Sequence, residues 1–458
     1  MIYYDTVSKV YYGVGSIMTM NERMLTGTMK INAKNHLEIG GVDTVDLVQK
    51  YGTPVYVYDI ARVKEQADKF KKTFKQKNVK AQVAYASKAF SSLALYQILA
   101  KEDVSLDVVS GGELYTAIQA GFPSQRIHFH GNNKSESEIE AALDYQIGCF
   151  VVDNFYELEM LDRLSREREQ MINVLIRVTP GVEAHTHEYI STGQVDSKFG
   201  FDLNSGQAQK ALQSIAGMPY IELLGLHSHI GSQIFETEGF TMAIETLLKQ
   251  AKQWQEDFGF ELKVLNLGGG FGIRYIPEDE PLAIEEHTTA IIESVESSIK
   301  ELQLSMPEIW IEPGRSLVGD AGVTLYQIGS QKKIPDVRQY LAVDGGMADN
   351  IRPALYDAKY TGILANRAND ATEETYSIAG KACESGDMLI WDLPLPKAES
   401  KDILAIFSTG AYGYAMASNY NRIPRPPVVF VENGKDFLAI KRETYADMLR
   451  LDQSINAE

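Results

Sequence analysis

The stretch AQVAYASKAFSSLALYQILA, residues 81–100, joins a short apolar run to a helical pattern through a lysine. Residues 81–86 have the character of a buried strand, and residues 91–100 carry apolar side chains at helical spacing. Lys88 stands at the junction among small residues. Most lysines keep their ammonium group in solvent and cover only their stems. Whether Lys88 is a working amine therefore depends on the fold to which this unit belongs.

The same strand-then-helix unit recurs along the chain. Strand-like runs begin at residues 81, 104, 126, 148, 173, 222, 263 and 308, and segments such as 112–121 and 154–170 have apolar residues at helical spacing. Short apolar runs that alternate with helical patterns are typical of buried parallel strands. Eight such units predict an α/β fold, a closed (β/α)8 TIM barrel, which we expect to span residues 58–318.

The polar and glycine-rich clusters of this region follow the ends of the expected strands. In chain order they read SKA, SGGE, GNNKS, DNF, PGVEAHTHEYISTG, HSHIGSQ, GGGFG and EPGR. Active sites of such barrels lie at the carboxyl ends of the strands. This pattern places Lys88 at the mouth of the barrel and favours a working amine.

The sequence on either side of the expected barrel lacks the alternation of strands and helices. Residues 319–458 contain short strands with close turns, which predicts a C-terminal antiparallel β domain of sandwich or barrel-like form. We expect residues 29–57, which precede the barrel, to pack with that domain. Residues 1–28 are rich in tyrosine and show no clean period, so we expect a mobile extension there.

The composition limits the class of function. A net charge of -18 argues against non-specific binding to nucleic acid or to an anionic membrane. No apolar run reaches spanning length, and the first residues lack the layout of a signal peptide. Two cysteines, Cys149 and Cys383, make no disulfide framework, which fits a reducing cytosol. We expect a soluble, cytoplasmic protein that acts on a small molecule.

Two glycine-rich turns predict a site for a phosphorylated ligand. LNLGGGFG at 265–272 ends a strand in three glycines, whose backbone amides can approach a phosphate closely. EPGR at 312–315 follows the last strand and adds an arginine. Barrels often bind phosphate at the loops after their last two strands.

The histidine pairs admit two interpretations. His227 and His229 alternate in HSHIGSQ and could both ligate a metal, and HTH at 185–187 repeats the pattern. Alternatively, one imidazole faces a ligand and the other packs outside. Because no carboxylate or cysteine set at metal spacing accompanies the pair, we favour one functional histidine and no metal.

Several candidates outside these turns carry weaker signals. Cys149, in GCFVVD, has the surroundings of a small core residue. Cys383, in KACESGD, lies among polar residues of the β domain and is either a loop cysteine without a role or a proton donor. Arg352, Tyr356 and Tyr412 are polar residues of the β domain that suit a ligand but are individually unspecific.

Together these motifs resemble the fold-type III decarboxylases that use pyridoxal 5′-phosphate (PLP), and above all the members that act on diaminopimelate. The matching stretches are HLEIGGVD, YGTPVYVYD, YASKA, DVVSGGEL, FHGNNKS, HSHIGSQI, LGGGFG, EPGR, RPALY, CESGD and GAY. They run from about residue 36 to residue 414, and their combination is specific although each is modest alone. The resemblance implies an enzyme that removes CO₂ from the D-centre of meso-diaminopimelate and releases L-lysine.

The resemblance also implies roles for the cofactor-binding residues. Lys88 would bind PLP covalently, His229 would stack on the pyridine ring, and Glu312 would bond the ring nitrogen. The charge of Glu312 would keep that nitrogen protonated, so that the ring accepts electrons. Further cofactor contacts would come from Ser232, Gly269, Gly270, Pro313, Gly314, Arg315 and Tyr412.

The remaining implied roles concern the substrate and the assembly. Cys383 would be the general acid, and the substrate would contact Arg315, Arg352, Tyr356, Glu384 and Tyr412. The far carboxylate of diaminopimelate suits the two arginines, and its far ammonium suits Glu384. A diamine-forming decarboxylase of the ornithine or lysine type has little use for Arg352. The resemblance further implies a homodimer in which the CESGD loop completes the site of the partner.

Two other functions stay open at this point. One is a zinc hydrolase that uses the His-x-His ligands, which a yellow cofactor chromophore without stoichiometric zinc would exclude. The other is a non-catalytic relative of the decarboxylases. The retention of both Lys88 and Cys383 argues against that second function.

Overall fold

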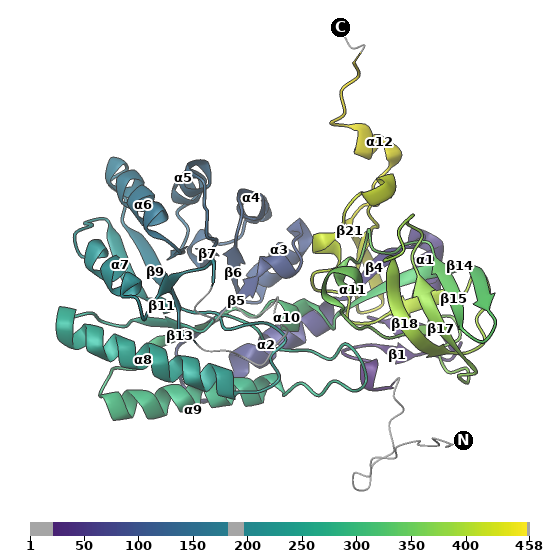
Figure 1. Cartoon of the computed structure of the whole chain (residues 1–458), viewed down its shortest axis with the longest axis horizontal. Helices are drawn as coiled ribbons and strands as arrows, with labels where there is room; N and C mark the ends of the chain where they lie inside the picture. Colours follow the sequence, from purple (N-terminus) through teal and green to yellow (C-terminus); the bar gives the residue numbers. More distant parts are fainter. Residues whose placement is uncertain (1–21, 182–196, 456–458) are drawn as a thin grey trace.

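The computed structural model describes residues 22–181 and 197–455. The HTH motif at 185–187 and residues 1–21 lie outside the described residues. Two bodies lie side by side in Figure 1: a ring of strands covered by helices, and a β domain coloured mostly green and yellow.

Eight parallel strands close into a barrel. They are β5 (Ala81–Ala86), β6 (Ser105–Val108), β7 (Ile127–Phe129), β8 (Cys149–Val152), β9 (Ile172–Thr179), β11 (Ile221–His227), β12 (Val264–Asn266) and β13 (Glu308–Ile311). Neighbouring strands pair throughout, and β13 pairs with β5 while β8 pairs with β9. The ring therefore has no free edge. This closure confirms the predicted (β/α)8 barrel.

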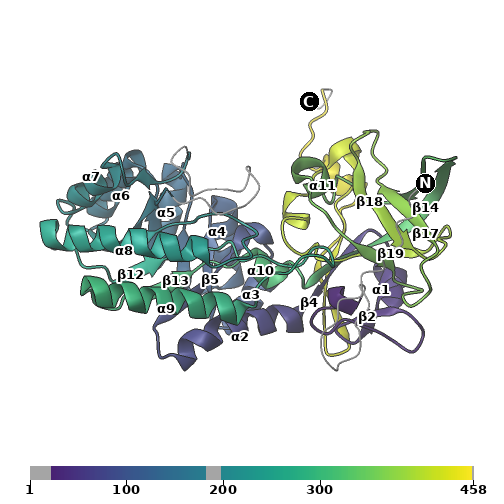
Figure 2. The ribbon, with the colours of Figure 1, turned by 60° about the horizontal axis from the view of Figure 1, so that its bottom comes forward.

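Eight helices surround the strands (Figure 2). They are α2 (Ile60–Gln76), α3 (Leu93–Lys101), α4 (Gly111–Ala120), α5 (Glu136–Tyr145), α6 (Phe155–Glu167), α7 (Gln207–Ile215), α8 (Glu238–Phe258) and α9 (Ile284–Leu302). The side chains of Ser110, Ser135 and Asn154 accept hydrogen bonds from the first-turn backbone of α4, α5 and α6. The polar motifs SGGE, GNNKS and DNF therefore begin helices, since such side chains satisfy free amide groups there.

The β domain combines strands from both ends of the chain. Its strands are β4 (Val55–Asp59), β14 (Gly322–Ile334), β15 (Arg338–Val343), β16 (Gly362–Leu364), β17 (Glu374–Ala379), β18 (Met388–Leu395), β19 (Ile403–Ile406), β20 (Val428–Glu432) and β21 (Lys435–Ile440). Most pairs are antiparallel, as predicted, but β15 pairs with β17 and β20 pairs with β4 in parallel. Parallel neighbours need long connections, and the connection between β4 and β20 includes the whole barrel.

The segment before the barrel belongs to the core of this β domain. It contains β1 (Lys30–Ile31), β2 (Leu37–Ile39), β3 (Val42–Asp43) and α1 (Thr44–Tyr51). Leu37, Leu47 and Val55 are buried in one cluster with Val323 and Val429. The N-terminal segment and the C-terminal strands therefore bury apolar surface together.

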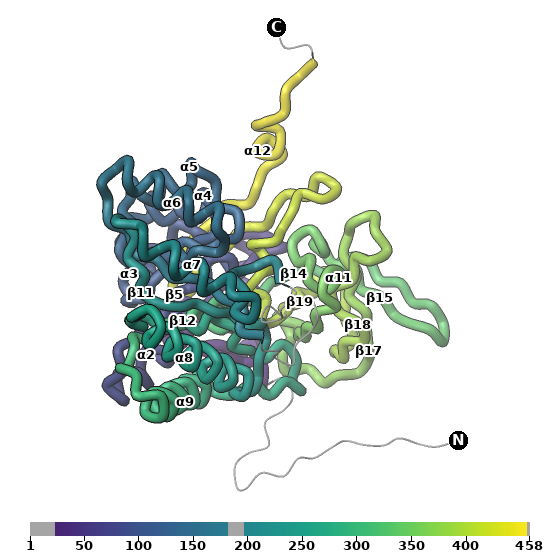
Figure 3. Tube along the Cα trace, turned by 60° about the vertical axis from the view of Figure 1, so that its left-hand side comes forward, coloured from purple at the N-terminus to yellow at the C-terminus, as the bar shows by residue number. Residues whose placement is uncertain are grey.

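Short helices occupy the joints and the C-terminal end. They are η1 (Glu22–Met24), η2 (Ser87–Ala89), η3 (Ser124–Arg126), α10 (Arg315–Val318), α11 (Arg352–Tyr356), η5 (Tyr414–Met416), η6 (Tyr420–Arg422) and α12 (Tyr445–Leu449). A short strand, β10 (Phe201–Asp202), pairs in parallel with the end of β9. In Figure 3 the segment with α12 projects away from both bodies. Within the described ranges, no helix has the length and apolar character needed to cross a bilayer.

A buried ion pair fixes the loop after β7. Lys134 Nζ donates to the carbonyls of Gly131 and Val151, each at 2.9 Å, and to Glu157 Oε1 at 2.7 Å. The two side chains are 0% and 2% exposed. Burial raises the pKa of Glu157, and the Lys134 ammonium offsets part of this rise.

We expect Lys134→Met to lower the free energy of unfolding by about 3–5 kcal/mol, because it leaves a buried carboxylate without its cation. Urea denaturation followed by circular dichroism measures the change. The control is Lys77→Met, which removes a surface pair with Glu293 at 3.0 Å and should cost less than about 1 kcal/mol. Equal losses in the two variants would show that the buried pair contributes no special stability.

Candidate active site

A cavity of about 660 Å³ opens at the carboxyl ends of the barrel strands, where the β domain meets the barrel. It brings together most of the residues predicted from the sequence: Lys88, His229, Ser232, Gly269, Gly270, Glu312, Gly314, Arg315, Arg352, Tyr356 and Tyr412. Three predicted residues, Pro313, Cys383 and Glu384, are not among the described residues that line it.

Lys88 lies in η2, immediately after β5, and its side chain is exposed in the cavity. Its neighbours Ser87 and Ala89 are buried, and the Ala89 carbonyl accepts a hydrogen bond from the Tyr412 amide at 2.8 Å. A Cβ atom at Gly314 would lie 3.0 Å from the Cβ of Ala86. Glycine therefore lets the EPGR turn pack against the segment that carries the amine.

The glycine turn after β12 is shaped by close contacts. Cβ atoms at Gly269 and Gly270 would lie 2.1 Å from the Glu312 carbonyl oxygen and 2.5 Å from the Gly231 carbonyl oxygen. Gly270 has a φ of +113°, which side chains disfavour. The turn therefore requires glycine, and it brings backbone close to the cavity as expected for a phosphate cradle.

His229 is fixed as a neutral ring above this turn. Its Nδ1 accepts the Gly269 amide at 3.2 Å. Burial lowers the pKa of His229 well below its usual value, and the positive charges of Lys88 and Arg177 lower it further. A neutral, oriented imidazole is suited to stacking on an aromatic ligand. The Gly269 amide is used by His229, and Ser232 and Arg315 line the same cavity as side-chain donors for an anion.

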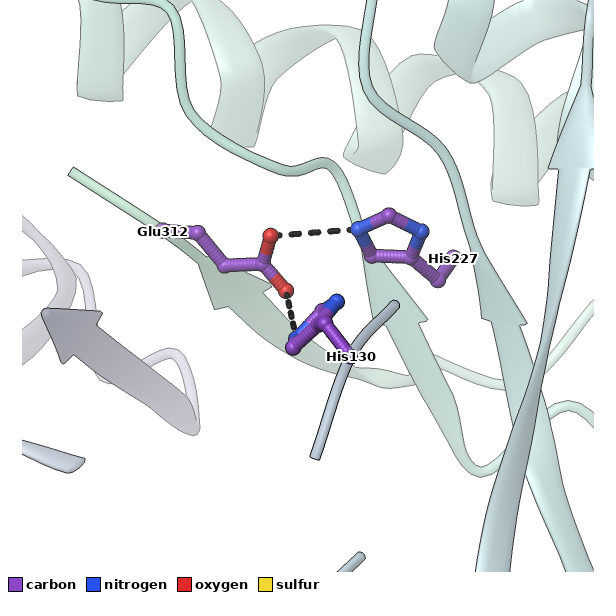
Figure 4. Close-up of side chains that lie close together, drawn as sticks. All are labelled: His130, His227 and Glu312. Carbon is purple, nitrogen blue, oxygen red and sulfur yellow. Dashed lines mark hydrogen bonds and ion pairs between the residues drawn. The ribbon is translucent and has the colours of Figure 1, made fainter. Parts of the chain in front are cut away.

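Glu312, directly after β13, is held on both carboxylate oxygens (Figure 4). Asn266 Nδ2 donates to Oε1 at 2.5 Å, and His227 Nε2 lies 3.1 Å from Oε2. His130 Nε2 lies 3.2 Å from Oε1. Burial would raise the pKa of Glu312, but His130 and His227 outweigh it, so the pKa falls well below its usual value. Glu312 is therefore ionised in a buried site.

The two histidines beside Glu312 differ in charge. Burial opposes a charge on His130, yet Glu312 and Asp107, whose Oδ1 lies 3.5 Å from Nε2, raise the pKa of His130 to about 9. Burial lowers the pKa of His227 in spite of Glu312. His130 is thus an imidazolium and His227 a neutral imidazole.

His130, His227 and Glu312 also lie close enough together to hold a metal ion. A metal ion would compete with a proton for the lone pair of His130, and the raised pKa of His130 favours the proton and with it an ion-pair network. Among the described residues, the predicted pair is divided: His227 contacts Glu312, and His229 contacts Gly269. The expectation that no carboxylate accompanies this pair is wrong, because barrel closure brings Glu312 to His227 from a different strand.

Two arginines lie at the side of the cavity that borders the β domain. Arg315 and Arg352 are each 7% exposed. In the described part of the chain, neither guanidinium forms an ion pair with a carboxylate, and Arg315 Nε has no hydrogen-bond partner. Their Nη1 atoms both donate to the hydroxyl of Tyr275, that of Arg352 at 2.9 Å. Two buried cations without carboxylates make this a site for an anionic ligand.

Several residues of the site were missed from the sequence. They are Asp107, His130, Arg177, Asn266 and Tyr275, all of which contribute to the cavity or hold a residue that does. Four of them interrupt apolar strand runs or directly follow one, as in VSLDVV, RIHFHG, NVLIRV and KVLNLGG. A polar side chain at the end of a buried strand was the signal that could have identified them.

The CESGD loop lies on the β domain with Cys383 exposed. The amide of Cys383 donates to Asn421 Oδ1 at 3.0 Å. The Asp387 carboxylate accepts the amides of Met347 at 2.6 Å and Ala382 at 2.8 Å. The loop is therefore held in place on the domain surface. Cys149 is buried, as predicted.

Comparisons with known proteins find relatives that match nearly the whole chain. The family model described as "Pyridoxal-dependent decarboxylase, pyridoxal binding domain" matches residues 60–319. The diaminopimelate decarboxylase of Bacillus methanolicus is 63% identical over 417 residues, 91% of this chain and 96% of that protein. The chain belongs to the diaminopimelate decarboxylase family. The Bacillus subtilis member is 61% identical over 428 residues, 93% of this chain and 98% of that protein.

A solved member of the family shares the whole architecture. The diaminopimelate decarboxylase of M. jannaschii, in complex with L-lysine, superimposes with a TM-score of 0.88 at 37% identity, covering 93% of this chain and 98% of that one. Family membership makes this chain a pyridoxal-dependent decarboxylase, a carboxy-lyase. It also removes the zinc hydrolase and the non-catalytic relative as candidates.

The residues of the cavity fit the cofactor of the family. A pyridinium nitrogen needs an ionised acceptor, and Glu312 is one. A phosphate needs a side-chain-free turn and a cation, which Gly269, Gly270 and Arg315 provide. The amine of Lys88 is exposed in the same cavity.

The raised pKa of His130 predicts a pH dependence of stability. A histidine whose pKa rises from about 6.5 to about 9 on folding stabilises the fold fully below pH 6.5, and this contribution is lost as the pH rises through 9. We expect the difference in unfolding free energy between wild type and His130→Gln to shrink by on the order of 3 kcal/mol from about pH 6 to about pH 10.

Urea denaturation at both pH values measures this difference. The control is His287→Gln, because His287 is also buried but burial lowers its pKa. Its contribution is present above pH 6.5 and partly lost at about pH 6, so the difference for His287→Gln should grow by less than about 1 kcal/mol from about pH 6 to about pH 10 and not shrink. A constant difference for His130→Gln over the same range would contradict the assigned charge.

Proposed function

We propose that each residue of this cavity has a separate role in the reaction. The reaction converts meso-diaminopimelate, at its D-centre, into L-lysine and CO₂. The chain is a carboxy-lyase of the diaminopimelate decarboxylase family, which forms lysine from diaminopimelate. One observation supports the assignment most strongly: the cavity contains an amine, Lys88, and two buried guanidiniums without carboxylate partners, Arg315 and Arg352. A substrate with a second carboxylate far from its reacting centre suits this arrangement.

PLP supplies an electron sink for the charge that is left when CO₂ departs. Lys88 would hold the cofactor covalently and yield its place to the amine of the substrate. Glu312 would keep the ring nitrogen protonated, because its charge is already stabilised by His130 and His227. His229 would cover the ring, and Ser232, Gly269, Gly270, Pro313, Gly314, Arg315 and Tyr412 would complete the cofactor site.

The far end of the substrate would be held by charge. Arg315 and Arg352 would bind its carboxylate, Tyr356 and Tyr412 would line its path, and Glu384 would accept its ammonium. Cys383 would return a proton to the carbon that loses CO₂. A diamine-forming reaction would leave Arg352 buried without an anionic partner.

For two of these residues we propose a site shared between subunits. Cys383 is exposed, and neither Cys383 nor Glu384 is among the described residues that line the cavity. We propose a homodimer in which each subunit lends this loop to the other, a reciprocal contact under two-fold symmetry. We also propose a cytoplasmic location, which the two free cysteines support.

Lys88→Ala should abolish covalent attachment of the cofactor. Borohydride reduction followed by peptide mapping measures the attachment site, and we expect the wild-type label on Lys88. Lys359→Ala is the control, since Lys359 also lines the cavity and its removal should leave the label in place. A label on any lysine other than Lys88 would refute the assignment.

Subunit mixing tests the shared site. Lys88→Ala and Cys383→Ala should each be inactive, and a hybrid dimer should contain one site with both defects and one with neither. We therefore expect up to about half of wild-type activity per hybrid dimer to return on exchange. Mass spectrometry confirms exchange; hybrids that form without any activity would show that the loop acts within its own chain.

A further inference from the structure

The hydroxyl of Tyr275 contacts both of the arginines that line the cavity. Tyr275 follows the glycine turn in GGGFGIRY and is not among the site residues predicted from the sequence. Both guanidiniums lie over its ring. The Cζ atoms of Arg315 and Arg352 are 5.5 Å and 5.0 Å from the ring centroid. The side chain is buried at 7% exposure and still lines the cavity.

The hydrogen bonds of this hydroxyl leave one group without a partner. A tyrosine oxygen accepts two hydrogen bonds and donates one. Both acceptor positions are used, by Nη1 of Arg315 and by Nη1 of Arg352. Within residues 22–181 and 197–455, no acceptor receives the hydroxyl hydrogen of Tyr275. A buried donor without an acceptor is costly, so the arrangement fits a ligand that accepts this hydrogen bond.

The two Nη atoms of Arg315 donate hydrogen bonds to two different residues that line the cavity. Its Nη2 donates to Ser232 Oγ at 2.8 Å, beside the glycine turn that suits the phosphate. Its Nη1 donates to Tyr275, which in turn contacts Arg352. Tyr275 therefore contacts both arginines, and Arg352 has no carboxylate partner among the described residues.

We infer that Tyr275 is a third binding residue for the far carboxylate of the substrate and so a determinant of specificity for amino acids that carry one. The inference rests on the proposed function, which places that carboxylate at Arg315 and Arg352. The two arginines would bind the carboxylate by charge, and Tyr275 would donate a hydrogen bond to it. A substrate without this carboxylate leaves three buried polar groups without a ligand, which disfavours its binding.

The acidity of the hydroxyl supports a donor role. Burial would raise the pKa of Tyr275, but Arg315 and Arg352 outweigh it and lower the pKa below its usual value. An acidic hydroxyl makes a stronger hydrogen bond to an anion. Tyr360 plays a different part: its hydroxyl accepts Arg352 Nη1 at 2.7 Å, but it does not line this cavity among the described residues. Tyr360 therefore supports the arginine from behind.

Binding of two matched probes to the holoenzyme tests the inference. L-lysine, the product, keeps the far carboxylate, and cadaverine has the same carbon chain and amines without it. We expect Tyr275→Phe to weaken L-lysine binding by about tenfold or more and to change cadaverine binding by less than about twofold. Isothermal titration calorimetry measures both, at cofactor occupancy matched by visible absorbance.

Two further variants separate the possible failures. Tyr360→Phe is the control, because it removes a hydroxyl from Arg352 outside the cavity, and should change the binding of either probe by less than about threefold. Arg352→Ala should weaken L-lysine selectively. If Arg352→Ala does so and Tyr275→Phe does not, the role of Tyr275 is wrong and the proposed function stands. If neither variant distinguishes the probes, the proposed carboxylate site is wrong as well.

Other effects of Tyr275→Phe also decide the matter. Equal weakening of both probes would show a general distortion of the cavity and overturn the inference. Loss of the cofactor in Tyr275→Phe, with L-lysine binding unchanged in reconstituted enzyme, would assign Tyr275 to the phosphate and overturn it too.

Discussion

The buried, ionised carboxylate of Glu312 is the interaction on which the rest of the site depends. A carboxylate in such a place is stable only when charges and hydrogen-bond donors surround it. Here they are Asn266, His227 and His130, which come from or directly follow three other strands of the barrel. Only a closed ring of strands brings these residues together. The ionised carboxylate at the cavity floor therefore depends on barrel closure.

The link between the barrel and the β domain starts at the same place. Glu312 directly follows β13, Arg315 begins α10, and β14 begins at Gly322, where it pairs with β4. A short piece of chain therefore carries the carboxylate of Glu312 and the guanidinium of Arg315 and leads into the sheet of the β domain.

The sequence was sufficient for the barrel and for most of the cavity, because strand period and strand-end motifs are local signals. Lys88, His229, Glu312 and Arg315 could be predicted in this way. The partners of Glu312 could not, since they meet it only after the ring closes, and a histidine within a strand does not reveal its neighbour. Motifs such as SGGE and GNNKS owed much of their polarity to helix caps. The parallel pairs of the β domain also escaped prediction, because strand character does not define direction.

The central claim is that His130 and His227 hold Glu312 as an acceptor for the cofactor nitrogen and not as a metal ligand. A crystal structure of the holoenzyme with L-lysine, with diffraction recorded on both sides of the zinc absorption edge, tests it most directly. The account predicts the ring nitrogen within hydrogen-bonding distance of Glu312, the lysine carboxylate at Arg352, and no anomalous peak between the histidines. A metal peak bonded to His130, His227 and Glu312, with the cofactor ring turned away, would contradict it.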